Sequence, residues 1–506
     1  MTDDDQRGPS RTAGLAAGLL AGAVGLGAAE LAAAFVRPQA APLIALGGAG
    51  VDRTPEWLKH WAIRSFGTHD KQVLLGSMLA VAAVAAALLG LLARTRPRAA
   101  GAALAALTAA GVAAALTRPD AGPVDAVPVL LGAAAAVAAL RALLPAAARG
   151  GRGDRRAFLL LGGGAAALAA GSTLLGRALA GRRDVGRARA ATRLPPPARP
   201  AAPLPRGADL RVPGLTPFTT PNRDFYRVDT ALVVPQVDPE DWTLRVHGLV
   251  DRPLEITFAE LLRRPLVEAD VTLTCVSNEV GGEYAGNARW LGASLAGVLR
   301  EAGVRAGADQ VFSRSADGFT VSTPLAAVLD GRDALLAVAM NGAPLPVPHG
   351  FPARLVVPGL YGYVSATKWV VDLKVSRFAD DRAYWTARGW ADHGEVRTMA
   401  RIDLPRPFAR VAAGRVAVAG VAWAQHRGVE AVQVRVDGGP WRTAHLAPVP
   451  NTDTWRQWVL ECDLAPGRRR IEARAVDGTG AVQTGRRADP FPAGATGWHS
   501  TVVTVR

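Results

Sequence analysis

The chain has 506 residues, of which 58 are Lys or Arg and 43 are Asp or Glu, so its formal net charge is +15. This length allows several domains and excludes a single small binding module. The two cysteines, Cys275 and Cys462, are too few for a disulfide scaffold or for a cysteine-ligated iron–sulfur cluster.

The positive charge is concentrated in the first part of the chain. Residues 1–206 carry a net charge of +13, whereas residues 207–506 carry only +2. The basic part is also the part rich in Ala, Leu and Gly, a combination typical of membrane proteins. We therefore expect contact with membrane lipid and no nucleic-acid partner.

Several stretches of residues 1–185 are apolar over the roughly 20 residues that a helix needs to cross a bilayer. They are approximately 12–36, 72–93, 99–117, 126–144 and 157–180. A secretory signal peptide explains at most one of them. The sequence therefore predicts a transmembrane region of about five helices, the number of these stretches.

The positions of Lys and Arg indicate how these helices are oriented. Arginines gather at 94–98 and 141–156, which places those two loops in the cytoplasm. An odd number of crossings then places everything after about residue 185 outside. The prediction is a multi-pass protein of the cytoplasmic (plasma) membrane. The loop 37–71 is also basic, and it fits only if its segment around Glu56 and Trp57 lies at the membrane surface.

Two features of the helices each have two interpretations. Gly14, Gly18 and Gly22 have the spacing that lets helix backbones approach closely in lipid, but a Gly-rich composition also produces it. Arg155-Arg156 before the last helix resembles a twin-arginine export signal. A cytoplasmic anchor with two adjacent arginines explains that pair equally well.

The rest of the chain divides by composition into three parts. Residues 186–213 are rich in Pro and predict a semi-rigid extended linker. Residues 214–395 mix short β-rich runs with helical stretches such as 257–264 and 292–302, which indicates an α+β domain. Residues 396–506 alternate apolar and polar residues between glycine turns, which predicts an antiparallel β-sandwich with Trp441, Trp455 and Trp458 in its core.

Cys275 ends a β-like run and precedes Gly281-Gly282. A thiol in this position is suited to act as a nucleophile or as a soft-metal ligand. The alternative is an inert core residue, which is also the simplest interpretation of Cys462.

The residues around Cys275 resemble the sulfite oxidase family of molybdopterin-dependent oxidoreductases, in its membrane-anchored bacterial form. The matching stretches are Thr220-Pro221-Asn222, Phe225-Tyr226-Arg227, Leu273 to Asn278, Asn287 to Gly292, His349 to Gly359 and Tyr361 to Trp369. The resemblance also implies that residues 396–506 form the immunoglobulin-like domain of that family, which often makes dimers. A homodimer is therefore a candidate assembly. Nothing about residues 1–185 follows from the resemblance.

The resemblance implies one molybdenum–molybdopterin cofactor per chain, with Cys275 as the protein's metal ligand. A thiolate suits such a metal, and Arg and Lys suit the phosphate of the pterin. The catalytic residues implied are Cys275, Arg227 and Trp390. The residues implied to bind the cofactor are Asn222, Tyr226, Arg227, Cys275, His349, Arg354, Ser365 and Lys368.

Departures from the family pattern leave the substrate open. The catalytic tyrosine of sulfite oxidases, about twenty residues after the lysine, is replaced here by Ala387-Arg388-Gly389-Trp390, unless Tyr384 reaches the site. The Arg-Asn-His of the family is Arg227-Val228-Asp229. Glu279 and Glu283, which follow Cys275, also disfavour an anionic substrate such as sulfite. Sulfoxide reduction or another oxygen-atom transfer stays open.

We therefore expect an enzyme that transfers an oxygen atom, with two electrons, to or from a small substrate outside the cytoplasm. No histidine lies in the predicted membrane helices, which disfavours a haem there and predicts an external electron-transfer partner, a cytochrome or a quinone-linked protein. One alternative is a hydrolase or transferase using Cys275 and His349. Another is a surface protein that binds a partner without catalysis.

Overall fold

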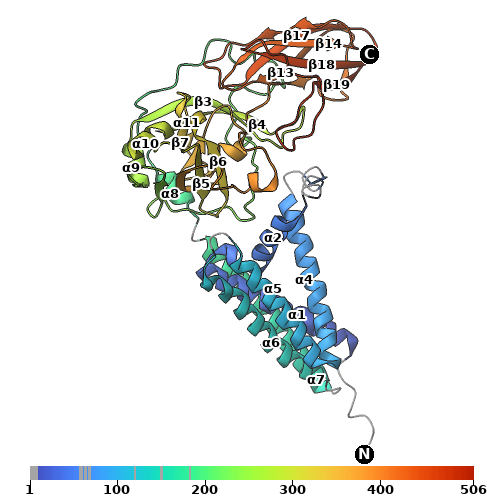
Figure 1. Ribbon diagram of the computed structural model, residues 1–506. Coiled ribbons are helices and arrows are strands. Elements are labelled where there is room, and N and C mark those ends of the chain that lie inside the picture. Colours follow the sequence, from blue (N-terminus) through green and yellow to red (C-terminus); the bar gives the residue numbers. More distant parts are fainter. Residues whose placement is uncertain are drawn as a thin grey trace, which may run out of the picture. The chain divides into compact units, whose positions relative to one another are not determined.

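The computed structural model describes residues 10–55, 58, 61, 65–66, 70–118, 121–148, 152–181 and 184–506. Its contacts divide the chain into two units (Figure 1). The helical unit comprises Met1–Asp184 together with Thr230–Val234, and the β-rich unit comprises Val185–Asp229 together with Pro235–Arg506.

Among its described residues, the helical unit contains five helices that are long and apolar enough to cross a membrane, judged by length and composition. These spans are Arg11–Phe35, Lys71–Thr95, Pro97–Leu116, Pro123–Ala146 and Arg156–Leu179. They agree with the five predicted stretches to within a few residues. Glu56 and Trp57, from the segment predicted to lie at the membrane surface, are outside the described residues.

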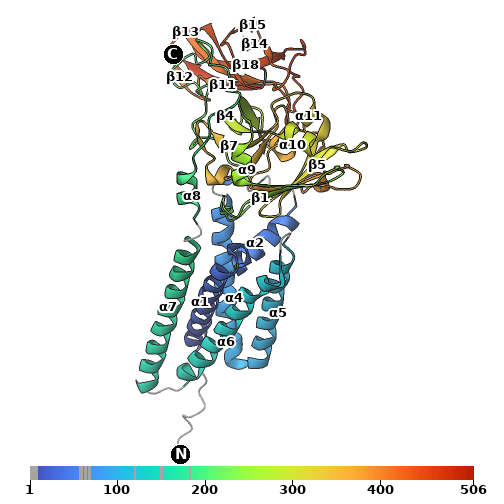
Figure 2. The ribbon, with the colours of Figure 1, turned by 90° about the vertical axis from the view of Figure 1, so that its left-hand side faces the viewer.

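The helices of this unit follow the chain as a series of antiparallel runs (Figures 1 and 2). Their bounds are α1 Arg11–Phe35, α2 Pro42–Arg53, α4 Asp70–Thr95, α5 Pro97–Leu116, α6 Val127–Ala148 and α7 Arg152–Gly181. Two of the connections contain a short 3-10 helix: η1 Pro38–Ala40 lies between α1 and α2, and η3 Pro123–Ala126 lies between α5 and α6. The arginine pair at 155–156 lies within the first turns of α7.

Helix α1 packs against α4, α6 and α7 (Figure 2). A Cβ atom added at Gly18 would lie 2.8 Å from the Cα of Gly90 in α4, and one at Gly22 would lie 2.6 Å from the Cβ of Ala86. One at Gly25 would lie 2.8 Å from the carbonyl oxygen of Gly132 in α6. These glycines therefore let the backbones approach closely, which favours the packing interpretation of their spacing.

The predicted linker is not wholly extended. Residues 186–191 form a short helix, α8 Gly186–Ala191. Farther on, the N–H of Ala198 donates to the carbonyl of Leu266 at 2.8 Å, and Arg199 bridges to Val267 as a parallel β-partner. The prolines keep the segment extended only after residue 194, and there it lies along a strand instead of spanning solvent.

Two sheets form the next part of the β-rich unit, where strands and short helices alternate as predicted. The first sheet has the order β2-β1-β10-β5-β6 and the second β3-β4-β7-β8, with β9 paired to β7. The bounds are β1 Thr243–Gly248, β2 Leu254–Thr257, α9 Phe258–Arg263, β3 Leu266–Thr274, β4 Ala285–Ser294, α10 Leu295–Ala302, β5 Gln310–Ser315, β6 Thr320–Pro324, α11 Leu325–Leu329, β7 Leu335–Met340, β8 Ala343–Pro344, η4 Val347–His349, β9 Arg354–Val356, η5 Gly362–Val364, β10 Val370–Ser376 and η6 Thr386–Arg388. Helix α10 begins later than predicted because β4 continues to Ser294, whose hydroxyl caps the helix.

Strands β3 and β4 are buried almost throughout, since a large apolar cluster packs on each face of their sheet. Trp290 of β4 is fully buried on one face, and Leu291 is buried on the other. The two strands pair from Leu266↔Ala293 to Thr274↔Ala285. This long antiparallel ladder holds the end of β3, where Cys275 follows, in one fixed place.

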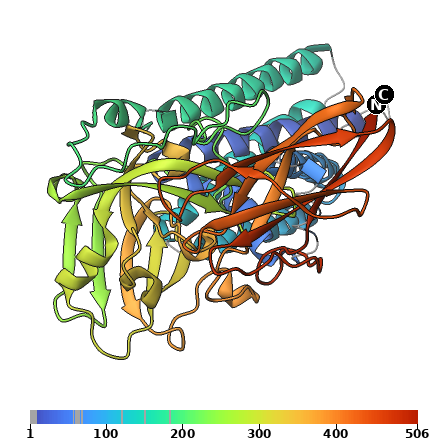
Figure 3. The ribbon, with the colours of Figure 1, turned by 90° about the horizontal axis from the view of Figure 1, so that it is seen from above.

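Residues 399–505 form two sheets that pack face to face (Figures 1 and 3). Their orders are β11-β13-β17-β16 and β12-β19-β18-β14-β15. The bounds are β11 Met399–Leu404, β12 Arg410–Val411, β13 Gly414–Trp423, β14 Val429–Val436, β15 Arg442–Thr443, β16 His445–Leu446, β17 Arg456–Leu464, β18 Gly467–Asp477 and β19 His499–Val505. Cys462 is buried between the sheets, as expected for a small apolar residue.

The three tryptophans predicted to fill this core have three different positions. Trp458 lies in the core between the two sheets. Trp455 is buried beside Phe218, to whose carbonyl its indole N–H donates at 2.8 Å, so it joins the two parts of the β-rich unit. For Trp441 the prediction is wrong: its ring lies outside the core, against Trp498 and Arg474.

Candidate cofactor site

Cys275 lies directly after β3 at the start of a hydrogen-bonded turn. Its N–H donates to the carbonyl of Tyr284 at 2.9 Å, and its own carbonyl accepts from Asn278 at 3.1 Å. The N–H and hydroxyl of Ser277 donate to the sulfur. The residue is partly exposed. Burial raises the pKa of its thiol, and the hydrogen bonds from Ser277 and the charge of Lys368 oppose that change. A partly exposed sulfur at a rigid turn is suited to bind a metal.

Three cationic side chains gather beside this turn. Arg354 in β9 is 5% exposed, and its guanidinium donates to the carbonyls of His349 at 3.1 Å and Ala366 at 3.3 Å. Lys368 and Arg227 both contact Asp229, through Nζ at 2.9 Å and Nε at 2.7 Å. Among the described residues no carboxylate lies within 4 Å of Arg354, so its charge is balanced by no acidic side chain there.

Burial and mutual repulsion change the acidity of these groups. Burial lowers the pKa of Arg354 to about 10 and that of Lys368 to about 8, and Asp229 opposes the change at Lys368. Burial, together with the charges of Arg354 and Lys368, lowers the pKa of His349 to about 3. His349 is therefore neutral at neutral pH, and the two cations stay largely charged.

Asn222, Tyr226 and Ser365 belong to the same region, but their polar atoms are already engaged to different extents. Asn222 donates to the carbonyl of Met340 at 3.1 Å and accepts from Asn341 at 2.7 Å. The hydroxyl of Ser365 lies 3.1 Å from the carbonyl oxygen of Leu360, so it fixes the loop after β9. Tyr226 stacks on Phe225 at 5.3 Å between ring centroids, and burial and nearby Cys275 raise its pKa.

The structure therefore brings together six of the predicted residues in one interacting group, which we call the Cys275 cluster. Electrostatic coupling links the thiol to Tyr226 and Lys368, Tyr226 to Arg354, and His349 to Arg354, Lys368 and Arg227. Its members are Cys275, Tyr226, Arg227, His349, Arg354 and Lys368. Asn222 joins through its backbone, which hydrogen-bonds His349.

Trp390 is not a member of the Cys275 cluster but packs in a neighbouring apolar cluster. It is 5% exposed and packs edge-on against Phe491 at 5.3 Å and near Tyr363 at 5.8 Å between centroids. It shares a buried apolar cluster with Val276, the neighbour of Cys275, and with Tyr361. Its catalytic role stays a prediction.

Tyr361, to which no role was assigned from the sequence, lies near Cys275. It is 3% exposed, its hydroxyl accepts from the N–H of Arg397 at 3.3 Å, and burial together with Cys275 raises its pKa to about 12. By contrast, Tyr384 packs its ring against Phe319 and under the Arg388 guanidinium. The sequence signal was present, since Tyr361 lies within the matching stretch, but only folding brings residue 361 next to residue 275.

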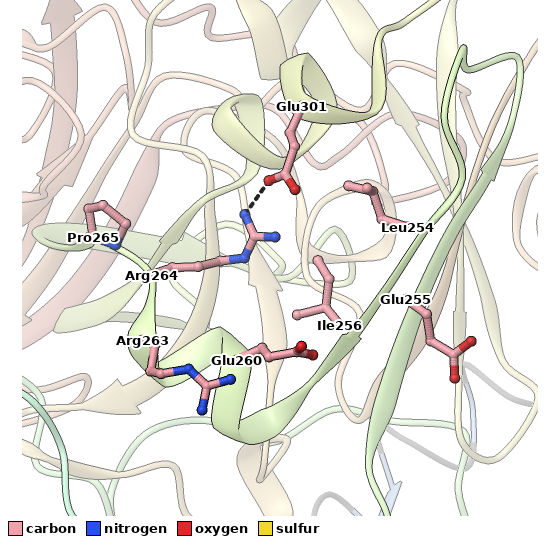
Figure 4. Close-up of a pocket in the computed structure, with 8 residues that line it drawn as sticks. All are labelled: Leu254, Glu255, Ile256, Glu260, Arg263, Arg264, Pro265 and Glu301. Carbon is pink, nitrogen blue, oxygen red and sulfur yellow. Dashed lines mark hydrogen bonds and ion pairs between the residues drawn. The ribbon is translucent and has the colours of Figure 1, made fainter.

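Two hollows lie elsewhere in the β-rich unit. One pocket of about 420 Å³ lies between α9 and α10, where Arg264 donates to Glu301 at 2.7 Å (Figure 4). Glu260 in this pocket caps α9 through the N–H and hydroxyl of Thr257. A second pocket, of about 590 Å³, is lined by residues 204–219. In the first pocket Glu260, Arg264 and Glu301 already have partners within the fold, and neither pocket includes the Cys275 cluster.

The donor set of the Cys275 cluster fits a molybdopterin. It offers one thiol for a soft metal and three cations against one carboxylate, an excess of positive charge that an anionic phosphate would balance. For a thiol–imidazole dyad the cluster is less suited, because burial raises the pKa of the Cys275 thiol.

Comparisons with known proteins agree with this chemistry. A family model described as "Oxidoreductase molybdopterin binding domain" matches residues 231–385. Chicken (Gallus gallus) sulfite oxidase is 33% identical over 317 residues, which cover 53% of this chain and 68% of that protein. For mouse (Mus musculus) mitochondrial sulfite oxidase the identity is 31%, and the match covers 53% of this chain but only 57% of the relative.

Two further relatives are bacterial. The uncharacterized oxidoreductase YuiH of Bacillus subtilis is 33% identical over 158 residues, covering 31% of this chain and 76% of that protein. The crystal structure of the sulfane dehydrogenase SoxCD from Paracoccus pantotrophus aligns with a TM-score of 0.50 at 26% identity, over 57% of this chain and 84% of that one.

The fold and the cluster define a molybdopterin-binding oxidoreductase. The chain belongs to the sulfite oxidase family, and it is a molybdenum-cofactor-dependent enzyme.

Proposed function

We propose that this chain is a membrane-anchored enzyme that transfers an oxygen atom, with two electrons, to or from a small substrate outside the cytoplasm. The observation that supports this proposal is the Cys275 cluster, a partly exposed thiol beside three cations in a chain of this family. The proposed organisation is a transmembrane region over 1–185, a linker over 186–213, a catalytic domain over 214–395 and an immunoglobulin-like sandwich over 396–506.

In this proposal the cofactor, one per chain, supplies a molybdenum atom that exchanges oxygen and electrons with the substrate. Cys275 holds the metal, and the hydrogen bonds from Ser277 stabilise the sulfur as a thiolate. Arg354, Lys368 and Arg227 hold the phosphate, and neutral His349 can donate a hydrogen bond without adding charge.

The chain's own groups also suggest how a substrate is oriented. Tyr361 stays protonated at neutral pH, and its hydroxyl accepts the N–H of Arg397, so its proton is available to donate. We assign Tyr361 the hydrogen-bonding role that the missing family tyrosine leaves open. Trp390 would position Tyr361 through the apolar cluster that they share. Electrons would pass to or from an external partner, and the sandwich is the candidate dimer surface.

Metal analysis tests the cofactor assignment. Full-length protein from molybdate-supplied cells should contain about one molybdenum per chain, as follows from one thiolate ligand per site. Cys275→Ser should lose the metal, whereas Cys462→Ser, which changes a buried thiol away from the site, should keep it. Equal molybdenum in the two variants would refute the assignment.

Activity and topology need separate measurements. Sulfite, sulfoxides and N-oxides should be screened with artificial electron donors and acceptors, and turnover of one class should disappear in Cys275→Ser. Protease added to intact spheroplasts should cut the β-rich unit, and protease added to inverted vesicles should not. The opposite pattern would place the enzyme in the cytoplasm.

A further inference from the structure

Asp229 is a buried carboxylate within the Cys275 cluster. Its side chain is 5% exposed, and Oδ2 accepts both from Arg227 Nε at 2.7 Å and from Lys368 Nζ at 2.9 Å. Lys368 Nζ also lies 3.3 Å from the carbonyl oxygen of Val228. Two of the three cations in the cluster are therefore held by one carboxylate, while Arg354 donates to carbonyl oxygens and lies over the ring of Trp290, 5.1 Å from its centroid.

This arrangement sets the charge that the pocket presents. Without Asp229, Arg227, Lys368 and Arg354 would face one another around a neutral histidine, and each would repel the other two. Burial and its two neighbouring arginines already lower the pKa of Lys368 to about 8, and Asp229 is the group that opposes this. The carboxylate keeps Lys368 charged at neutral pH while cancelling one of the pocket's positive charges.

Asp229 also stands at a boundary of the chain. The next five residues, Thr230–Val234, belong by their contacts to the helical unit. The carbonyl of Ala231 accepts from Lys71 Nζ at 2.6 Å, and Leu232 packs so close to Gly47 that a Cβ added there would lie 2.9 Å from Leu232 Cδ1. The loop that carries Tyr226 and Arg227 is thus fixed at one end by Asp229 and continues into a segment held by α2 and α4.

We propose that Asp229 is a positioning residue of the cofactor pocket, which holds Arg227 and Lys368 for the phosphate while the Thr230–Val234 segment ties the same loop to the helical unit. This inference rests on the proposed function of the Cys275 cluster.

The first test measures anion binding by the cofactor-free full-length chain, with inorganic phosphate as the probe. Asp229→Asn keeps the size of the side chain and removes its charge. Arg227 and Lys368 then lose the carboxylate that positions them, and Lys368 loses the group that keeps it charged, so phosphate affinity should fall at least about tenfold. Asp229→Glu should restore the affinity of the unchanged protein. The matched control is Asp333→Asn, which removes the partner of Arg199 at an exposed site and should change the affinity less than about twofold.

The second test measures hydrogen exchange of residues 222–229. Leu232→Ala should speed this exchange at least about fivefold and leave the sandwich strands unchanged, because residues 222–229 lose support from the segment that follows. Leu88→Ala, at an exposed α4 position 58% accessible, is the control and should change neither. Unchanged or increased phosphate affinity in Asp229→Asn, or unchanged exchange in Leu232→Ala, would overturn the proposal. Neither readout depends on molybdenum content, so failure here is distinguishable from failure of the proposed function.

Discussion

His349 should make the cofactor-free protein unstable in acid. The ring is 7% exposed, and burial with the neighbouring Arg354 and Lys368 lowers its pKa from 6.5 to about 3. The folded state therefore keeps the imidazole neutral, whereas the unfolded chain takes up a proton below pH 6.5. Stability that is present above that pH is lost as the pH falls toward 3.

The magnitude follows from the size of the pKa change. Each pH unit between the two pKa values costs about 1.4 kcal/mol, so lowering the pH from 6.5 to 4.5 should cost on the order of 3 kcal/mol. His349→Gln cannot be protonated and should not show this loss. Exposed His445→Gln is the control and should behave like the unchanged protein.

The assay is urea denaturation of the cofactor-free full-length chain at pH 7.0, 5.5 and 4.5. Unfolding is monitored by hydrogen exchange in the peptide that carries β9. Exchange in this peptide reports the catalytic domain separately from the helical unit. The reasoning fails if the unchanged protein and His349→Gln lose stability in parallel over this range.

Three other substitutions test the packing and the pocket. Gly18→Ala should destabilise the helical unit by about 1–3 kcal/mol, because its Cβ would meet Gly90. Gly101→Ala is the control, since position 101 faces open space and should tolerate the change. Thermal unfolding of the two variants in detergent compares their stability. Trp455→Phe removes the hydrogen bond to the Phe218 carbonyl and should cost about 1–3 kcal/mol by urea titration; an unchanged midpoint would contradict this. Arg354→Gln should weaken cofactor retention at least about tenfold in a dialysis assay, since it removes a buried charge that no acidic side chain of the described residues balances. Wild-type retention would refute that role.

Local and periodic features of this protein could be predicted from the sequence. The five apolar spans were predictable because a bilayer imposes a minimum length of apolar residues, which the sequence displays directly. The family motifs that include Cys275, His349 and Arg354 were equally visible, because they are contiguous in the chain.

Contacts between distant residues required the tertiary structure. Trp441 and Trp458 have similar alternating surroundings in sequence, yet only Trp458 is in the core, because which face of a strand is covered depends on the other sheet. Similarly, the linker contains helix α8 and lies along β3, although its prolines alone predict an extended chain.

The same distinction applies to the candidate site. The sequence by itself determined which residues could bind a metal and a phosphate, since their chemistry is intrinsic to the side chains. Only the tertiary structure decided that Asp229 lies between Arg227 and Lys368, and that Tyr361 lies beside Cys275. Electrostatic and hydrogen-bonding partners depend on distance in space, and 139 residues separate Asp229 from Lys368 along the chain.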